Sequence, residues 1–224
     1  MAKNKFQRIF NIKKFPMDLG RLCISVLPLY YRMKKHYVSE DAKKSLKISG
    51  GAILVANHTG FADPFKVNSC IWHRRTHFIA AQEVMKKGLI NVLLKGMGCI
   101  KIRRNIFDIE CIKKSVNTLK DGYLLAMFPQ GSITKDGSLD AIKSGAVLIA
   151  SQADVPIIPI YISKRKHFWQ RTHVAIGELF YCKDYVSKKM LTAKDISEIT
   201  QHLLEKTIEC KNLVESDGNK NDNI

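Results

Sequence analysis

The chain has 224 residues, a formal net charge of +17 and a hydrophobic fraction of 46%. This length is sufficient for one α/β domain with a sizeable core, and the apolar fraction excludes a chain that is disordered throughout. The charge favours a polyanionic partner, either a nucleic acid or an anionic membrane surface. Residues 1–47 contain twelve Lys and Arg against three acids, so more than half of the surplus lies near the N-terminus. A solvated, solubilising tail is the alternative explanation of this surplus.

The six cysteines are widely scattered, and no pair has the spacing C-x-x-C. This distribution argues against a zinc cluster and against a small disulfide framework. Reduced thiols in a cytoplasmic protein are therefore expected, each of them a small buried apolar residue.

Residues 1–37 combine lysines and arginines with interleaved aromatic and aliphatic residues. The uncharged apolar run at residues 22–31 is about half of the ~20 residues that a membrane-spanning helix needs, and Pro28 interrupts it. No small-residue cleavage site follows the run, which argues against a signal peptide. We therefore expect a helical arm that lies in the membrane interface, with basic side chains snorkelling around apolar anchors.

From about residue 49 onward, short apolar runs alternate with amphipathic stretches. The first predicted strand is at 52–56, and a helix follows that begins at Pro64 with Asp63 as its N-cap. Strands are then predicted at 77–81, 98–102 and 123–128, and they alternate with helices at 84–94, 109–119 and 144–153. The last predicted elements are strand residues at 155–162, 174–176 and 179–181 and a helix at 194–214. The two prolines in 155–162 predict that this strand lies at a sheet edge or a bend. The alternation predicts an α/β domain at 38–214, with a twisted, largely parallel sheet flanked by helices, and a polar tail at 215–224.

His58 follows the first predicted strand by two residues, and Asp63 follows it by five. This spacing places an imidazole on a strand-to-helix turn and a carboxylate at the start of the next helix. The carboxylate can accept the proton of one ring nitrogen and leave the other nitrogen to act as a general base toward a hydroxyl. No Ser or Cys nucleophile adjoins the pair, so direct attack by a bound hydroxyl is favoured over a covalent mechanism. A helix N-cap is the structural alternative for Asp63, and the two roles are compatible.

Three further motifs follow this pair along the chain. They are Gly98-Cys99-Ile100-Lys101-Ile102-Arg103-Arg104, Phe128-Pro129-Gln130-Gly131-Ser132 and Val155-Pro156-Ile157-Ile158-Pro159-Ile160. Together with Asn57-His58-x4-Asp63, their order and spacing resemble the four motifs of the glycerolipid acyltransferases. The chain resembles the 1-acylglycerol-3-phosphate acyltransferase family over about residues 50–162, and four ordered motifs are a much stronger signal than any one of them.

The resemblance implies a role for each matching position. His58 corresponds to the family's base, and Asp63 corresponds to the carboxylate that orients it. Arg104 corresponds to the arginine that holds the acceptor's phosphate, a task suited to a bidentate guanidinium. Gly131 corresponds to the glycine of the third motif, where a side chain would crowd the substrate. Lys143 corresponds to the basic residue of a basic-x-Gly step.

The third motif departs from the family pattern F-P-E-G-T-R, because Gln130, Ser132 and Ile133 replace Glu, Thr and Arg. Gln130 keeps the length and an acceptor oxygen of Glu but loses its charge. Gln130 and Ser132 remain expected substrate-binding residues. This departure bears on the identity of the acceptor more than on the class of reaction.

The expected reaction transfers a fatty acyl chain from acyl-CoA or acyl carrier protein to the sn-2 hydroxyl of lysophosphatidic acid, which gives phosphatidic acid. The resemblance implies no metal and no cofactor besides the thioester co-substrate. The expected partners are this donor, a lysophospholipid acceptor and an anionic membrane, with the protein peripheral or monotopic on the cytoplasmic side of the cell membrane. No RNA-binding signature occurs, so no nucleic acid is expected. The alternatives are another lysolipid acceptor, or a non-catalytic basic binder of anionic lipid or RNA, which would not need His58 and Asp63.

Overall fold

The structure is a computed structural model of the chain. It describes residues 32–86, 88–96, 98–103, 106–130, 139, 142–164, 170–186 and 191–221. The predicted arm lies outside this part of the chain up to residue 31. Within the described residues, no helix is both long enough and apolar enough to cross a membrane.

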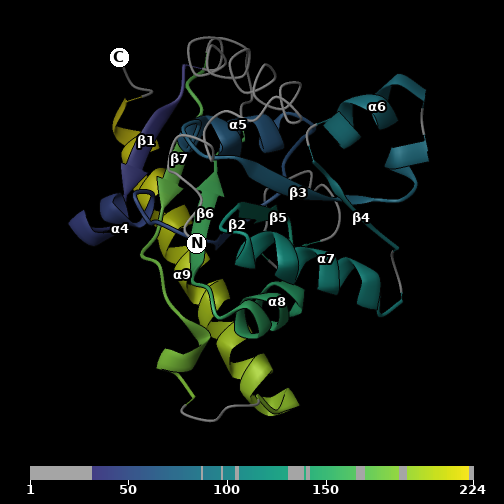
Figure 1. Ribbon diagram of the computed structural model, residues 1–224. Coiled ribbons are helices and arrows are strands. Elements are labelled where there is room, and N and C mark those ends of the chain that lie inside the picture. Colours follow the sequence, from purple (N-terminus) through teal and green to yellow (C-terminus); the bar gives the residue numbers. More distant parts are fainter. Residues whose placement is uncertain are drawn as a thin grey trace.

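The described residues form one seven-stranded sheet in the order β1-β7-β6-β2-β5-β3-β4 (Figure 1). The strands are β1 (Lys34–Tyr37), β2 (Ala52–Ala56), β3 (Thr76–Ala81), β4 (Ile100–Ile102), β5 (Leu124–Met127), β6 (Ile157–Ile162) and β7 (His173–Ile176). The helices are α4 (Glu40–Ser45), α5 (Asp63–Cys70), α6 (Gly88–Gly96), α7 (Ile109–Lys120), α8 (Gly145–Ala153) and α9 (Ala193–Asn221), with the 3-10 turns η2 (Val84–Lys86) and η3 (Cys182–Asp184). Neighbouring strands are parallel throughout, except that β6 and β7 are antiparallel.

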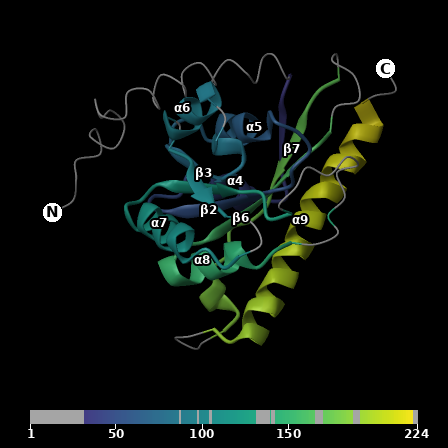
Figure 2. The same ribbon diagram turned by 90° about the vertical axis from the view of Figure 1, so that its right-hand side faces the viewer.

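Helices cover both faces of the sheet, with α5 on one side and α7 and α8 on the other (Figure 2). Successive side chains of a strand point to opposite faces, and β2 illustrates the result. Ile53 and Val55 pack in the core layer that includes residues of α7 and α8, whereas Leu54 and Ala56 pack in the layer that includes residues of α5. All of β2 is therefore buried, which is why its sequence is an uninterrupted apolar run. The predicted fold class is confirmed.

The strand β6 lies inside the sheet, between β7 and β2, so the prediction of an edge position for residues 155–162 is wrong. The sheet tolerates Pro159 because the neighbouring strand β7 ends at Ile176, just before the position opposite this proline. The carbonyl of Pro159 still accepts from the N–H of Gly177 at 2.9 Å. The missing N–H of the proline therefore falls at an interruption of the pairing, which resumes at the antiparallel bridge between Ile157 and Phe180.

The structure shifts two predicted boundaries. Residues 34–37 form the edge strand β1, which pairs with β7, so the predicted division at residue 37 falls at the end of a sheet strand. The sequence pattern does not predict this strand, because its buried side chain is the polar residue His36. The ring of His36 stacks on that of His173, with ring centroids 5.1 Å apart. At the other end of the chain, α9 continues to Asn221, so the predicted tail at 215–224 begins inside this helix.

Candidate active site

The candidate site lies at the carboxyl ends of the parallel strands β2 and β5, an edge of α/β sheets at which ligands commonly bind. Asn57 follows β2 directly. Its side-chain amide donates to the carbonyl of Ile162 at 3.0 Å and accepts from the N–H of Ile162 at 2.7 Å. These two hydrogen bonds join the end of β2 to the end of β6, and they fix the point from which the turn with His58 begins.

The turn after β2 brings the two predicted catalytic residues together. His58 Nδ1 lies 3.1 Å from Asp63 Oδ2. The side chain of Asp63 is fully buried, whereas 20% of the His58 side chain is accessible to solvent. The imidazole is therefore open to a bound molecule while its carboxylate partner is shielded from water.

The buried carboxylate of Asp63 is the centre of a hydrogen-bond network. Its Oδ2 also accepts from the backbone N–H groups of Thr59 at 2.5 Å and Gly60 at 2.7 Å. Its Oδ1 accepts from the hydroxyl of Thr59 at 3.2 Å and from the ammonium of Lys66 at 3.0 Å. Burial by itself raises the pKa of Asp63, but the hydrogen bonds from His58 and Gly60 and the charge of Lys66 outweigh burial and lower the pKa. Asp63 is therefore a carboxylate at neutral pH.

Asp63 is not the N-cap of α5, contrary to the prediction. The cap position is Ala62, which makes no side-chain capping hydrogen bond, and Asp63 is the first residue of the helix. Its carboxylate turns back toward the preceding turn, where it meets the N–H groups described above. Pro64 fits in this first helical turn because an N–H at that position has no intrahelical acceptor.

Phe128 and Gln130 hold His58 from the side of β5. The ring of Phe128 stacks on the imidazole of His58, with centroids 4.5 Å apart and planes inclined by 26°. The side-chain oxygen of Gln130 accepts from the backbone N–H of His58 at 3.1 Å. This hydrogen bond requires an acceptor oxygen but no charge, so glutamine meets the requirement as glutamate would.

Lys66 is a residue of this site that the sequence analysis missed. It is buried on α5, three residues after Asp63, and its ammonium contacts the same carboxylate that orients His58. Residues at i and i+3 share one face of a helix. An Asp–Lys pair at this spacing, at the start of the helix after the candidate base, is the signal that would have identified Lys66.

The other predicted substrate-binding residues fall into two groups. Arg104, Gly131 and Ser132 lie outside the described residues. Lys143 is exposed, and its backbone N–H donates to the carbonyl of Pro129 at 3.2 Å. This contact places the backbone of Lys143 beside the segment that carries Gln130.

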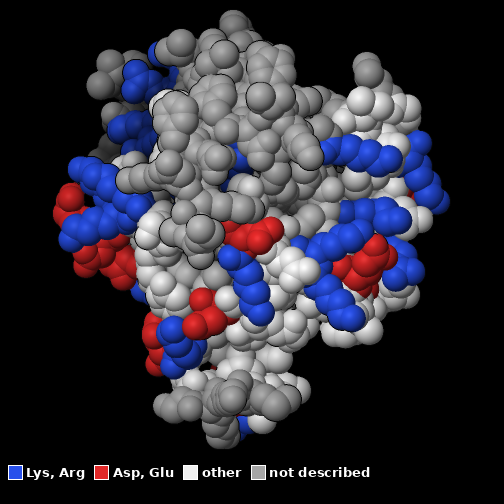
Figure 3. All heavy atoms as spheres, viewed as in Figure 1, with Lys and Arg blue, Asp and Glu red and all other residues white. Residues whose placement is uncertain are grey.

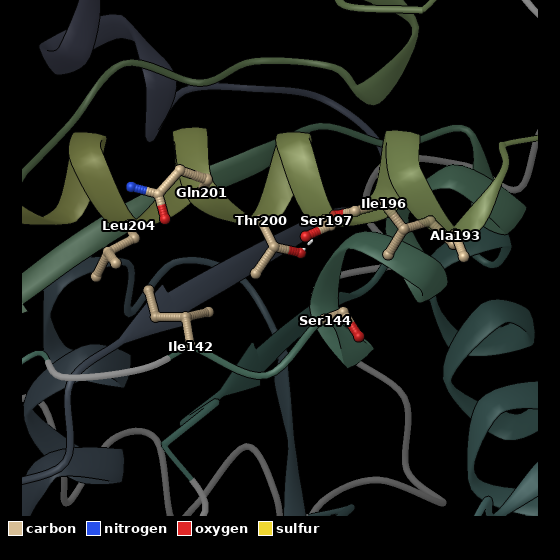
Figure 4. A pocket seen from close by; sticks show the side chains of 8 residues that line it. All are labelled: Ile142, Ser144, Ala193, Ile196, Ser197, Thr200, Gln201 and Leu204. Carbon is tan, nitrogen blue, oxygen red and sulfur yellow. Dashed lines mark hydrogen bonds between the residues drawn. The ribbon is translucent and has the colours of Figure 1, made fainter.

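A cavity of about 390 Å³ lies between the start of α8 and the first turns of α9 (Figure 4). It is lined by Ile142, Ser144, Ala193, Ile196, Ser197, Thr200, Gln201 and Leu204. Ile142 and Ile196 pack against the core layer of α7 and α8, whereas Phe128, on which His58 stacks, packs against the opposite layer. The cavity and the His58–Asp63 pair are therefore separate features.

The cysteines of the described chain do not offer an alternative nucleophile. All five are free thiols, and burial raises the pKa of each, to about 11 for Cys70 and about 12 for Cys99. The reactive form of cysteine is the thiolate, so none of these five is activated near neutral pH. The same part of the chain contains no group of three or more His, Cys, Asp or Glu side chains that could hold a metal ion.

The hydrogen bonds of Asp63 determine the tautomer of His58. Because the carboxylate is ionised and can only accept, Nδ1 of His58 carries the proton and Nε2 carries the lone pair. An imidazole in this state takes a proton from a hydroxyl, and the carboxylate stabilises the imidazolium that results. The geometry is therefore the one that the predicted role of His58 as a general base requires.

Comparison with known proteins identifies the class of the protein. The family model for acyltransferases matches residues 34–163, and the chain belongs to this acyltransferase family. It is 29% identical over 153 residues to a chloroplastic 1-acyl-sn-glycerol-3-phosphate acyltransferase of Arabidopsis thaliana, a match that covers 66% of this chain and 41% of that protein. It is 26% identical over 159 residues to the 1-acyl-sn-glycerol-3-phosphate acyltransferase of Bacillus subtilis, which covers 67% of this chain and 79% of that protein. The chain thus spans less than half of the plant relative's length.

A solved structure has the same fold. The crystal structure of the 1-acyl-sn-glycerophosphate (LPA) acyltransferase of Thermotoga maritima superposes with a TM-score of 0.62 at 18% sequence identity. The superposition covers 88% of this chain and 83% of the other. At this identity, the comparison shows that the two chains share the same fold.

Replacing Lys66 by Met is expected to lower kcat and to leave both Michaelis constants nearly unchanged. Loss of one charge-assisted hydrogen bond corresponds to about 1.5–3 kcal/mol, or about tenfold or more in rate. Lys66 lowers the pKa of Asp63, so its removal raises that pKa, and the acid limb of the pH–rate profile should move to higher pH. Steady-state kinetics across pH measure both effects.

Two further variants complete this test. Lys66→Arg keeps the positive charge and should restore part of the rate, which loss of general stability would not allow. Lys113→Met, at an exposed position on α7, is the matched control and should behave as the unsubstituted protein. An unchanged pH profile in Lys66→Met would show that Lys66 does not act through Asp63.

Proposed function

We propose that this protein is a 1-acylglycerol-3-phosphate O-acyltransferase, which moves a fatty acyl chain from a thioester to the sn-2 hydroxyl of lysophosphatidic acid and so forms phosphatidic acid. The observation that carries the proposal is the buried, ionised carboxylate of Asp63, which orients His58 as a base in an acyltransferase-family domain. The names of the Arabidopsis and Bacillus relatives support this acceptor.

In the proposed reaction, Nε2 of His58 takes the proton of the acceptor hydroxyl. The hydroxyl oxygen attacks the thioester carbonyl, and the tetrahedral intermediate collapses with formation of the ester and loss of the thiolate. The imidazolium of His58 then returns its proton to the thiolate, which leaves as the free thiol. Asp63 stabilises the imidazolium between these two proton transfers. Backbone N–H groups stabilise the oxyanion in reactions of this kind.

The proposed donor is acyl-CoA or acyl carrier protein. Both present anionic groups, and a protein with a net charge of +17 attracts either of them. The thioester is already activated toward a hydroxyl, so the proposed reaction needs no metal and no further cofactor. Purified enzyme with each donor in turn, assayed by release of the free thiol, distinguishes the two.

The proposed acceptor contacts follow the matching motifs. Arg104 binds the phosphate of the acceptor, and Gly131, Ser132 and Lys143 border the same substrate. Gln130 positions the base, because its side-chain oxygen accepts a hydrogen bond from the backbone N–H of His58.

Another lysolipid acceptor is the second candidate, because Gln130 stands where the family pattern has Glu. A panel of lysolipids with labelled acyl-CoA, analysed by lipid chromatography, identifies the acceptor directly. A non-catalytic binder of anionic lipid or RNA would produce no labelled product with any member of the panel.

The proposed site of action is an anionic bilayer on the cytoplasmic side of the cell membrane, reached through the arm at residues 1–31. Its uncharged run is too short to span, and each basic residue near an anionic surface contributes about 1 kcal/mol. An acceptor with one acyl chain resides in the bilayer. An enzyme held at the surface therefore meets its acceptor at a high local concentration.

Substitution of His58 by Ala is expected to abolish acyl transfer and to leave the fold intact, because the side chain lies on a partly exposed turn. Asp63→Asn should also reduce the rate severely, since an amide does not hold the base in its reactive tautomer. Turnover of lysophosphatidic acid is the measurement, and thermal unfolding is the control for folding. Near-normal turnover by His58→Ala would refute the mechanism.

Substitution of Arg104 by Ala is expected to weaken acceptor binding more than donor binding. One charge-assisted contact to phosphate corresponds to about 1.5–3 kcal/mol, or about tenfold to a hundredfold in the Michaelis constant of the acceptor. Lys101→Ala, at an exposed position in the same motif, is the control. An equal rise in both Michaelis constants would assign Arg104 to general structure or to the donor.

Deletion of residues 1–31, which leaves β1 intact, is expected to reduce sedimentation with anionic liposomes. The shortened enzyme should acylate micellar acceptor far better than bilayer acceptor. High salt should release the complete protein only in part, because screening removes the ionic attraction and not the apolar one. Unchanged sedimentation after the deletion would contradict the role of the arm, and complete release by salt would contradict insertion of its apolar residues.

A further inference from the structure

The loops after β2, β3 and β4 lie along one edge of the sheet. These strands run parallel to one another through β5, so their carboxyl ends share this edge with His58. The sheet order places β2 and β4 three strand spacings apart, or about 14 Å. The three loops therefore lie on the side of the sheet that carries the candidate site, and we term them the carboxyl rim.

Each of the three loops of the carboxyl rim exposes apolar side chains. Phe61 follows β2 and is 84% exposed, and Val84 follows β3 and is also exposed. After β4, Ile106 is 56% exposed and Phe107 is 71% exposed. Single exposed apolar residues are ordinary, but several on neighbouring loops at one edge mark an interaction surface.

Basic residues accompany these apolar side chains. Lys86 and Arg103 are exposed on the loops after β3 and β4. Figure 3 shows blue side chains gathered over α6, β4 and the start of α7. Asp108 lies in the same region, but its carboxylate is buried and paired with Arg103. Glu110 is paired with Lys114, and Glu83 is exposed on the loop after β3, so basic side chains of this region are accompanied by carboxylates.

The opposite edge of the sheet carries exposed acidic side chains together with lysines. Exposed carboxylates gather there, in the turns before β5 and β6 and after β1 and β7. They are Glu40, Asp41, Asp121, Asp154 and Asp184. Three of these carboxylates pair with lysines of the same edge, Glu40 with Lys43, Asp41 with Lys44 and Asp154 with Lys183. The opposite edge therefore carries both signs of charge, and the carboxyl rim is distinguished by the exposed apolar side chains on its three loops.

The chain enters the domain at the edge that carries the carboxyl rim. The strand β1 is parallel to β7, and β7 is antiparallel to β6, so the amino end of β1 lies beside the carboxyl end of β6. Because β1 and β4 are the two edge strands, the segment before β1 and the loop after β4 lie at opposite ends of this edge. A planar surface in contact with both would extend across the candidate site.

We propose that the carboxyl rim docks on an anionic lipid bilayer, with Phe61, Ile106 and Phe107 inserted among the lipids and Lys86 and Arg103 at the headgroups. This docking is additional to that of the arm, and it turns His58 toward the membrane that supplies the acceptor. The inference rests on the proposed function for its purpose, but its physical basis is the exposed apolar and basic side chains. Aromatic and aliphatic residues flanked by Lys and Arg are the composition that interfacial segments use.

A double substitution in the complete protein tests the carboxyl rim. Ile106→Asn with Phe107→Asn removes two inserted side chains and is distant in sequence from His58 and Asp63. Binding is measured by sedimentation with vesicles of equal parts phosphatidylglycerol and phosphatidylcholine. The variant should bind about tenfold more weakly, equivalent to about 1.4 kcal/mol. Its rate on vesicle-borne lysophosphatidic acid should fall in proportion, with no change on micellar acceptor.

Trp72→Asn is the matched control, because Trp72 is 56% exposed but lies in the turn before β3, at the opposite edge. It should bind vesicles as the unsubstituted protein does. A second measurement uses Phe107→Trp with brominated phospholipids, which quench an inserted tryptophan. Greater quenching than in the unsubstituted protein is expected, and its absence would show that this loop stays outside the bilayer.

The remaining outcomes separate this inference from the proposed function. Unchanged vesicle binding by the double variant would overturn the inference, even if transfer to micellar acceptor is normal. The inference would also be wrong if that variant binds vesicles normally and loses only transfer from acyl carrier protein, since the surface would then serve a protein donor. If the unsubstituted protein fails to acylate micellar acceptor, the proposed function is wrong. The vesicle-binding measurement would still test the docking surface in that case.

Discussion

A fully buried carboxylate requires hydrogen-bond donors for both of its oxygens, and the region around Asp63 is organised by this requirement. One oxygen accepts from His58 and from two backbone N–H groups of the turn, and the other accepts from Lys66 and the Thr59 hydroxyl. The path of the turn and the direction of the imidazole therefore depend on the same oxygen atom. The start of α5 carries both Asp63 and Lys66, so the helix fixes the carboxylate and its counter-ion together.

Residues next to three central strands of the sheet, β2, β5 and β6, also hold His58 in place. Asn57 ties the end of β2 to β6, and Gln130 reaches from beyond β5 to the backbone of His58. Phe128 supports the ring itself. His58 is therefore held at its backbone, at its Nδ1 and on its ring face by different segments, and this restraint fixes the direction of its Nε2. The acceptor oxygen that this arrangement needs is common to Gln and Glu.

The direction of the strands also separates the two edges of the sheet. Five parallel strands end at one edge, and the described loops there carry His58 together with exposed aromatic and basic residues. The opposite edge carries exposed carboxylates, three of which pair with lysines. One topological property, the common direction of the strands, thus places His58 on the same side of the molecule as the exposed side chains of Phe61, Ile106 and Phe107.

The sequence by itself determined the α/β class, the buried strands such as residues 52–56, and the adjacency of His58 and Asp63. These features depend on local periodicity and on a short turn, which leave few alternatives. Only the tertiary structure decided that residues 34–37 form a strand, that β6 lies inside the sheet, and that Gln130 contacts His58 over a separation of 72 residues. Such contacts depend on which strands become neighbours, and no local pattern in the chain encodes that order.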